Sequence, residues 1–192
     1  ALTGARQKIA NYPGVTVERK AGHASFADGR PLSLIDLPGT YSLTPASPDE
    51  AVTRDVILGK QAGEKRPDAL IIVLDASNLE QHLVFAQEVL ELGRPTVVAL
   101  NMVDLAERDG LTLDPAALET ALGVPVIPTV AVRRRGLAEL SAAIAEARDR
   151  VSGETAPRAH VTLPERRMLA HEMAHGAILS ETAKHRIHAR MD

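Results

Sequence analysis

The sequence predicts an α/β fold in which a mostly parallel sheet carries helices on both faces, with a short helical appendage after it. Three continuous apolar runs, at residues 69–74, 95–100 and 124–130, are typical of parallel strands that are buried on both faces. A segment with helical periodicity follows each run, at residues 79–92, 114–122 and 137–147. Because strands and helices alternate in this way, βαβ units are the expected building blocks.

The chain before these units has a different pattern. Short β-type runs at residues 23–27 and 32–35 are separated by an Asp-Gly pair at 28–29, which is a strong signal for a hairpin turn. Residues 49–58 have helical character, and a Ser-Pro pair at 47–48 is a suitable start for that helix. We therefore expect a hairpin and a helix to precede the parallel strands.

The composition changes after Arg150, which suggests a domain boundary. Residues 1–150 carry the strand and helix pattern, whereas residues 151–164 are polar, contain two prolines and are interpreted as a linker. Residues 165–192 are helix-prone but broken by Gly176, so they are predicted to be a partial helical domain.

Composition and charge exclude several classes of protein. Apolar residues make up 45% of the chain and aromatic residues only 2%, so the core must consist of Leu, Val, Ile and Ala. The net charge is −3 and the only dense basic run is 133–135, which gives no support for a nucleic-acid surface. Cysteine is absent, so disulfides and thiolate metal sites are excluded. The longest apolar run is far shorter than the ~20 residues that span a bilayer.

The first candidate site follows the predicted strand at 32–35. Asp36, Leu37, Pro38 and Gly39 have the form D-x-x-G. In a nucleotide hydrolase, an Asp at this position holds Mg²⁺ through water, and the Gly offers its amide to a γ-phosphate because it has no Cβ to prevent close approach. The motif is common, and a plain turn after a strand is the alternative interpretation.

The second candidate site follows the predicted strand at 95–100. Asn101 and Asp104 form an N-x-x-D motif. A carboxylate at Asp104 could accept hydrogen bonds from N1–H and the 2-amino group of guanine, a pair of donors that adenine does not have. Asn101 is expected to connect neighbouring loops. The alternative is an ordinary helix start capped by Asn101.

Two loops complete the predicted nucleotide site. Thr16 lies in a loop-like stretch before the hairpin, where a hydroxyl could bind Mg²⁺ only while a γ-phosphate is present. The loop after the last strand could place the backbone amides of Val130, Ala131 and Val132 near the guanine O6. A switch Thr, D-x-x-G, N-x-x-D and a final loop, in this order at strand ends, indicate a translation-factor-like GTPase. Thr16 and Gly39 are the predicted catalytic residues.

Longer segments around these motifs resemble one family, the FeoB-type ferrous iron transport proteins. Residues 11–20 (NYPGVTVERK) resemble the family's switch I. Residues 36–43 (DLPGTYSL) and 47–55 (SPDEAVTRD) resemble its switch II. Residues 75–80 (DASNLE) and 99–104 (ALNMVD) also match. The resemblance extends over residues 1–150, and the tail from Val161 to Asp192 resembles the start and end of the family's helical domain with a middle portion left out.

The resemblance implies a function and a location. It implies a domain that binds GTP and GDP with Mg²⁺, hydrolyses GTP slowly, and reports its nucleotide state to an attached transmembrane Fe²⁺ permease. The implied location is the cytoplasmic face of a bacterial inner membrane, with a helical domain as neighbour and possible homo-oligomers. Thr16 and Asp36 would serve Mg²⁺, while Asn101, Asp104 and the loop amides would bind the base.

The sequence departs from the family in one important respect. The phosphate-binding pattern G-x-x-x-x-G-K-[ST], and the central strand before it, would precede Ala1 and do not occur in this chain. Loss of a central strand would leave buried backbone groups unpaired on both neighbouring strands, at ~1–3 kcal/mol each. We therefore expect the molecule to contain residues beyond the printed sequence, and the structure to show an unfilled position in the sheet.

A second departure concerns the rate of hydrolysis. Many GTPases place a Gln after D-x-x-G to orient the attacking water, whereas Thr40 and Tyr41 follow Gly39 here. Slow intrinsic hydrolysis is expected, and the resemblance implies that K⁺ assists it.

Two alternative functions remain open from the sequence. Without a phosphate loop, the chain could be a nucleotide-free interaction module. His171 and His175 also form an H-E-x-x-H motif, typical of zinc hydrolases, with Glu172 as the general base. A third zinc ligand would be needed, and the candidates are Glu181, His185 and His188.

Overall fold

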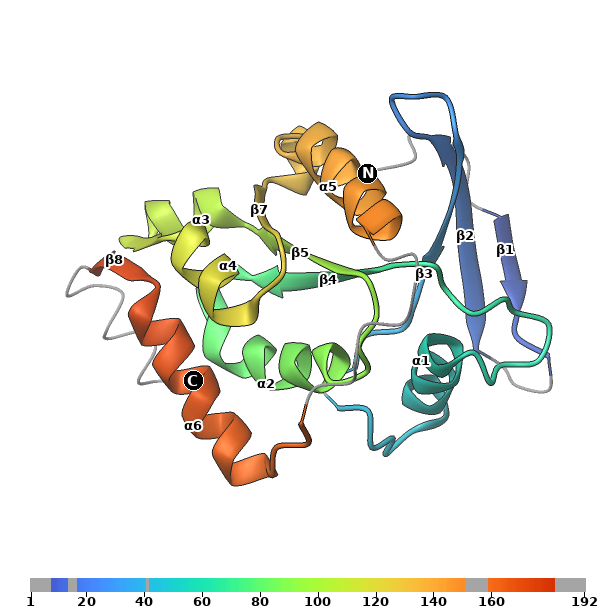
Figure 1. Ribbon diagram of the computed structural model, residues 1–192, viewed down its shortest axis with the longest axis horizontal. Coiled ribbons are helices and arrows are strands. Elements are labelled where there is room, and N and C mark those ends of the chain that lie inside the picture. The colour runs from blue at the N-terminus through green and yellow to red at the C-terminus, as the bar shows by residue number, and fades with distance from the viewer. Residues whose placement is uncertain (1–7, 14–16, 41, 151–158, 182–192) are drawn as a thin grey trace.

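A computed structural model describes residues 8–13, 17–40, 42–150 and 159–181, and Figure 1 shows the arrangement of the elements. Its centre is a parallel sheet with the strand order β4-β5-β7, made of β4 (Leu70–Asp75), β5 (Thr96–Asn101) and β7 (Val126–Thr129). The three apolar runs of the sequence form these strands, as predicted.

The register of this sheet brings three polar residues to one edge. Asp75 lies opposite Asn101 on the neighbouring strand, and Asn101 lies opposite Thr129. All three are the last residues of their strands. Because ligands of open α/β sheets bind outside the carboxyl ends of the strands, this edge is where a binding site is expected.

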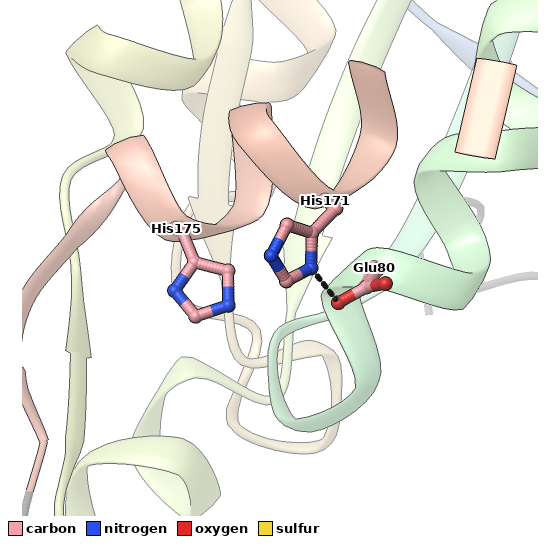
Figure 2. A group of neighbouring side chains, drawn as sticks. All are labelled: Glu80, His171 and His175. Carbon is pink, nitrogen blue, oxygen red and sulfur yellow. Dashed lines mark hydrogen bonds and ion pairs between the residues drawn. The ribbon is translucent and has the colours of Figure 1, made fainter. Parts of the chain in front are cut away.

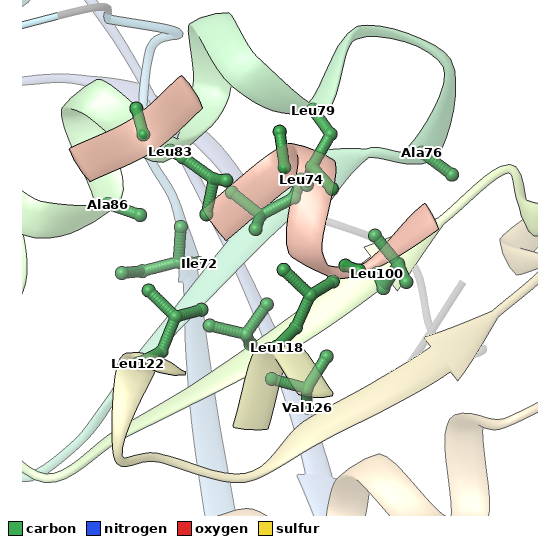
Figure 3. Packing of buried hydrophobic residues seen from close by; sticks show 14 of the residues in the cluster. Ile72, Leu74, Ala76, Leu79, Leu83, Ala86, Leu100, Leu118, Leu122 and Val126 are labelled. Carbon is green, nitrogen blue, oxygen red and sulfur yellow. The ribbon is translucent and has the colours of Figure 1, made fainter. Parts of the chain in front are cut away.

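Helices cover both faces of the parallel sheet (Figure 1). On one face, α2 (Leu79–Leu90) and α4 (Pro115–Leu122) pack on the apolar side chains of the strands, and α6 (Leu163–Gly176) packs on these two helices. Together they form the main core, part of which Figure 3 shows. On the other face, α5 (Leu137–Arg150) buries Leu140 and Ile144 against Val97 and Ala99 of β5. Alternate residues of β5 thus point to opposite faces, and both sides are buried.

The first strands form a separate antiparallel sheet with the order β1-β2-β3 (Figure 1). The predicted hairpin is present as β2 (Glu18–Ser25) and β3 (Pro31–Asp36), and Gly29 supplies a φ of 84° in the turn between them. The strand β1 (Lys8–Asn11) was not predicted, and of its residues only Asn11 belongs to the segment 11–20 that resembles switch I. It pairs with the far edge of β2, so backbone pairing overrides a weak local signal.

Local capping explains where the predicted helices begin and end. The helix α1 (Pro48–Leu58) starts at Ser47, whose side chain accepts a hydrogen bond from the Glu50 amide, and stops at Gly59 in the left-handed conformation. The helix α4 has the predicted Asp114 cap, which accepts a hydrogen bond from the Ala116 amide.

None of the helices in the described ranges combines the length and apolar character needed to cross a membrane.

The end of the described chain differs from the sequence prediction. The helix α6 begins at Leu163, two residues inside the predicted linker, and ends at Gly176 as predicted. The chain then forms β8 (Ile178–Glu181) instead of more helix, and β8 pairs with β6 (Leu111–Leu113), another element that was not predicted. This pairing joins segments about seventy residues apart, which local sequence patterns cannot reveal.

A short helical element follows each parallel strand. These elements are the 3₁₀ turn η1 (Ala76–Asn78) after β4, the helix α3 (Val103–Arg108) after β5 and the 3₁₀ turn η2 (Ala131–Arg133) after β7. All three lie just beyond the polar edge of the sheet and present the loops of the candidate site.

The two large sheets do not pair with each other within the described part of the chain. The strand β3 is hydrogen-bonded to β2, and β4 to β5, while a cavity of about 1370 Å³ is lined by the facing residues of β3 and β4. Val73 of β4 is 58% exposed although it belongs to an apolar strand. Among the described residues, β3 and β4 are therefore edge strands with the cavity between them, which is compatible with the expected unfilled position in the sheet.

Candidate functional site

The cavity between the two sheets extends to the carboxyl ends of the parallel strands. Its lining includes Asp36 at the end of β3, Gly39 in the turn after it, Asn101 at the end of β5 and Ala131 in the loop after β7. Four of the residues predicted from sequence therefore share one cavity.

Asn101 connects two loops at the edge of the sheet, as expected. Its Oδ1 accepts a hydrogen bond from Thr129 Oγ1 at 3.2 Å and another from the Ala131 amide at 3.1 Å. Thr129 is 2% exposed and Asn101 is half-buried, so the contact is largely shielded from solvent. A neutral amide oxygen with two donors inside the protein holds the end of β5 and the loop after β7 in a fixed relation.

Asp104 lies in the first turn of α3 and not in an extended loop. The helix is preceded by Met102, whose φ of 61° places it in the left-handed region, so the sequence alternative of a helix capped by Asn101 is wrong. The Asp104 side chain is 19% exposed and has Arg133 Nη1 at 3.6 Å from its Oδ2. Because Arg133 is largely exposed, this is a weak surface ion pair that leaves the carboxylate accessible.

The loop after β7 is a tight turn that uses most of its own amides. The amides of Val130 and Arg135 are hydrogen-bonded to each other's carbonyl oxygens, and the Ala131 amide is used by Asn101. Val132 protrudes from the loop with 92% of its surface exposed. Of the three amides predicted to face a base, two are thus engaged within the protein.

The D-x-x-G turn is attached to helix α1. The Thr53 hydroxyl of α1, which is buried, donates to the Pro38 carbonyl oxygen at 3.0 Å. Asp36 and Gly39 are exposed, and a Cβ added at Gly39 would meet no atom within 4 Å. No contact in the described structure requires glycine at this position.

A network missed by sequence reasoning ties the segment after Gly39 to helix α6. The Glu88 carboxylate of α2 accepts from the Leu43 amide at 2.6 Å and from Ser42 Oγ at 3.2 Å. The same carboxylate lies 2.8 Å from Arg166 Nη1 of α6. Arg166 is 4% exposed and also binds Glu91. One buried guanidinium thus joins the appendage to the segment that follows the D-x-x-G motif.

The predicted residues fall into three groups. Asp36, Gly39, Asn101 and Ala131 share the cavity, while Asp104, Val130 and Val132 lie on the adjoining loops outside its lining. Thr16 lies outside the described residues. Thr129, Thr53, Glu88 and Arg166 were missed. Only Thr129, a polar residue at the end of an apolar run, had a signal in the sequence.

The H-E-x-x-H motif lies on α6, with His171 and His175 one turn apart (Figure 2). Among the described residues, the third side chain that joins them is Glu80 of α2, which was not a sequence candidate. Glu181 belongs to β8 and is not part of this group, and His185 and His188 lie outside the described residues.

Comparison with known proteins gives a consistent family assignment. Residues 1–144 match the family model described as Ferrous iron transport protein B. The Fe(2+) transporter FeoB of Salmonella typhimurium strain LT2 is 49% identical over 147 residues, and that of Escherichia coli strain K12 is 48% identical over 147 residues. Each match covers 74% of this chain but only 18% of the relative, so the chain spans about a fifth of the length of these proteins.

Solved structures give the same result. The cytosolic domain of L. pneumophila FeoB is similar with a TM-score of 0.78 and 29% identity, covering 92% of this chain and 90% of that chain. The cytosolic domain of T. maritima FeoB in GDP form I has a TM-score of 0.71 and 39% identity, covering 82% of this chain and 58% of that one. With the sheet order, the strand-end motifs and these matches in agreement, the chain belongs to the ferrous iron transport protein B family, and its fold is that of the family's G domain.

Proposed function

We propose that this chain is the guanine-nucleotide-binding part of a bacterial Fe²⁺ transporter, and that it binds GTP and GDP. The observation that carries the proposal is the shared cavity at the carboxyl ends of the strands, lined by Asp36, Gly39, Asn101 and Ala131. Structures of related T. maritima domains in GDP and GMPPNP forms support it.

Asp104 is the proposed selector of the base. Its carboxylate would accept two hydrogen bonds from the guanine edge in place of the weak contact with Arg133. Asn101 would hold the loop that carries Ala131 and Val132 in position beside the base, because it already binds the Ala131 amide. Guanine is then favoured over adenine because adenine cannot supply the same pair of donors.

Asp36 and Thr16 are the proposed Mg²⁺ residues. Asp36 fits this role because it offers an exposed carboxylate at the end of β3 beside Gly39, and oxygen ligands are those that Mg²⁺ prefers. The ion would neutralise phosphate charge when bound. Gly39 would bring its amide to the γ-phosphate, which explains a glycine at a position where no protein contact demands one.

Hydrolysis of GTP is proposed to be slow. Thr40 follows Gly39, and its hydroxyl is used within the same segment, donating to the Ser42 carbonyl oxygen at 2.7 Å. No Gln stands beside the D-x-x-G motif to orient water. A monovalent cation such as K⁺ is proposed to assist, and equal turnover in Na⁺ and K⁺ would remove that part of the proposal.

Coupling to an attached membrane permease is proposed to pass through the buried Arg166. The segment after Gly39 is bonded to Glu88, and Glu88 to Arg166 of α6. A change in this segment on nucleotide exchange would therefore alter the docking of α6 on the G domain. The proposed location is the cytoplasmic face of the membrane, because the similar T. maritima FeoB structure is described as a cytosolic domain of an iron transporter.

A titration with a fluorescent GDP analogue tests the proposal. The probe is added to the chain as printed and to an extended chain that supplies a strand and a G-x-x-x-x-G-K-[ST] loop before Ala1. The extended chain is expected to bind, with GDP and GTP but not ADP displacing the probe, and the printed chain is expected to bind far more weakly because it has no phosphate cradle. Absence of binding by a folded extended chain would favour the alternative, a nucleotide-free interaction module.

A further inference from the structure

A cluster of two imidazoles and one carboxylate lies on the surface away from the nucleotide cavity. It comprises His171 and His175 of α6 and Glu80 of α2 (Figure 2). One potential ligand atom from each residue lies within 4.8 Å of the others, and all three residues are exposed. None of them lines the cavity between the two sheets.

The packing of two helices creates this cluster. Ala170 and Ala174 of α6 are buried in the core with Leu83 and Ala86 of α2. Small side chains at this contact let the helix backbones approach closely, so that residues at the edge of the contact meet across it. His171 Nδ1 lies 3.1 Å from Glu80 Oε2, and the ring centroid of His175 lies 4.2 Å from that of His171.

An exposed His–Glu pair is a common surface contact that contributes little to stability, and it does not by itself indicate a metal site. The second imidazole is the informative feature. His171 and His175 are four residues apart on one helix, so both rings lie on the same face, and the carboxylate comes from a different helix. The result is a set of three convergent donors from two elements of the fold.

We propose that Glu80, His171 and His175 bind a divalent first-row transition-metal ion that bridges α2 and α6. Two imidazole nitrogens and one carboxylate oxygen suit Zn²⁺, Co²⁺, Ni²⁺ and Fe²⁺ better than Mg²⁺ or Ca²⁺. Bonds of about 2.0–2.2 Å in a tetrahedral site place ligand atoms about 3.3 Å apart. Rotation of three exposed side chains closes the spacing of up to 4.8 Å to that distance, with water as the fourth ligand.

A bound metal ion would strengthen the contact between α6 and the G domain. The ion joins the G-domain helix α2 to α6, on the same pair of helices that Glu88 and Arg166 connect internally. Because it binds the folded arrangement and not the separated helices, it stabilises the docked position of α6. This inference stands independently of nucleotide binding.

Titration of the purified metal-free chain with Co²⁺, followed by its visible absorption and by competition with Zn²⁺, tests the proposal. One ion is expected per chain, with a rise in the thermal midpoint. Outer-shell changes alone alter metal affinity about 10–100-fold, so removal of a direct ligand by Glu80→Gln, His171→Ala or His175→Ala should weaken binding by at least about tenfold. Glu80→Gln is nearly isosteric, so it keeps the test independent of folding.

Control variants distinguish this metal site from other possible metal ligands in the chain. Glu139→Gln changes an exposed carboxylate on α5, and Glu172→Gln changes the glutamate of the H-E-x-x-H motif. Both variants are expected to bind the metal as the parent chain does. The double variant His185→Ala and His188→Ala is also expected to retain binding. Retained affinity in Glu80→Gln, or loss of binding in the tail double variant alone, would overturn the proposal.

Discussion

Asn101 and Asp104 are three residues apart in the sequence but have different surroundings in the structure. The Asn101 side chain is held by Thr129 and the Ala131 amide, so its conformation is set by the protein. Asp104 has only a weak contact with an exposed arginine. The first side chain is therefore held by the protein, whereas the second is the one that we propose binds the base.

Asp104→Asn in the extended chain tests that difference. Replacement of one carboxylate oxygen by an amide group puts a donor opposite the guanine donors, so guanine binding should weaken by ~1–3 kcal/mol while xanthine, which has a carbonyl at C2, becomes favoured. Competition of GDP and XDP against a fluorescent analogue measures both effects. Arg133→Ala is the control, and base preference there should not change. The same preference in Asp104→Asn as in the parent would refute the assignment of Asp104.

At the scale of single elements, the loop between β7 and α5 shows how the backbone sets the geometry of the site. Gly136 has a φ of 78°, and a Cβ built there would lie 2.2 Å from the Pro128 carbonyl oxygen. Glycine is therefore required both by conformation and by space. The close approach keeps the loop folded back on β7, where the Ala131 amide reaches Asn101.

Comparison of two glycine substitutions separates the cost of steric overlap from the cost of backbone strain. Gly29→Ala adds a methyl group at a φ of 84° where nothing lies within 4 Å, so only backbone strain of about 1 kcal/mol is expected. Gly136→Ala adds the overlap with Pro128, so the loss of unfolding free energy should exceed that of Gly29→Ala by at least about 1 kcal/mol. Urea unfolding of both variants measures the difference. Equal losses would show that the loop relaxes without cost.

At the scale of the whole molecule, the contact of α6 with the G domain includes one buried cation between two carboxylates. Arg166 is paired with Glu88 and Glu91 of the G domain. Burial acts to raise the pKa of Glu91, but hydrogen bonds from Arg166, the Val161 amide and His160 outweigh it, so the pKa is lowered from its ordinary value of 4.5. The charged form of Glu91 is thus favoured by folding.

This shift predicts a dependence of stability on pH. A carboxylate with a lowered pKa in the folded state adds stability above its ordinary pKa, and that stability is lost as the pH falls through the folded value. Unfolding midpoints in urea should therefore fall below pH 4.5, and Glu91→Gln should reduce the size of that fall. Glu107→Gln, on an exposed position of α3, should behave as the parent does. The same pH dependence in both variants would exclude Glu91 as a source.

Sequence patterns alone determined the class of the fold, the parallel strands, most helices and the order of the nucleotide motifs, because these depend on local periodicity, capping and polar residues at strand ends. Only the tertiary structure revealed the pairing of β6 with β8, the link from Glu88 to Arg166, and the meeting of Glu80 with His171 and His175. These contacts join residues far apart in the chain, and their positions depend on how whole helices and sheets pack, which no local pattern encodes.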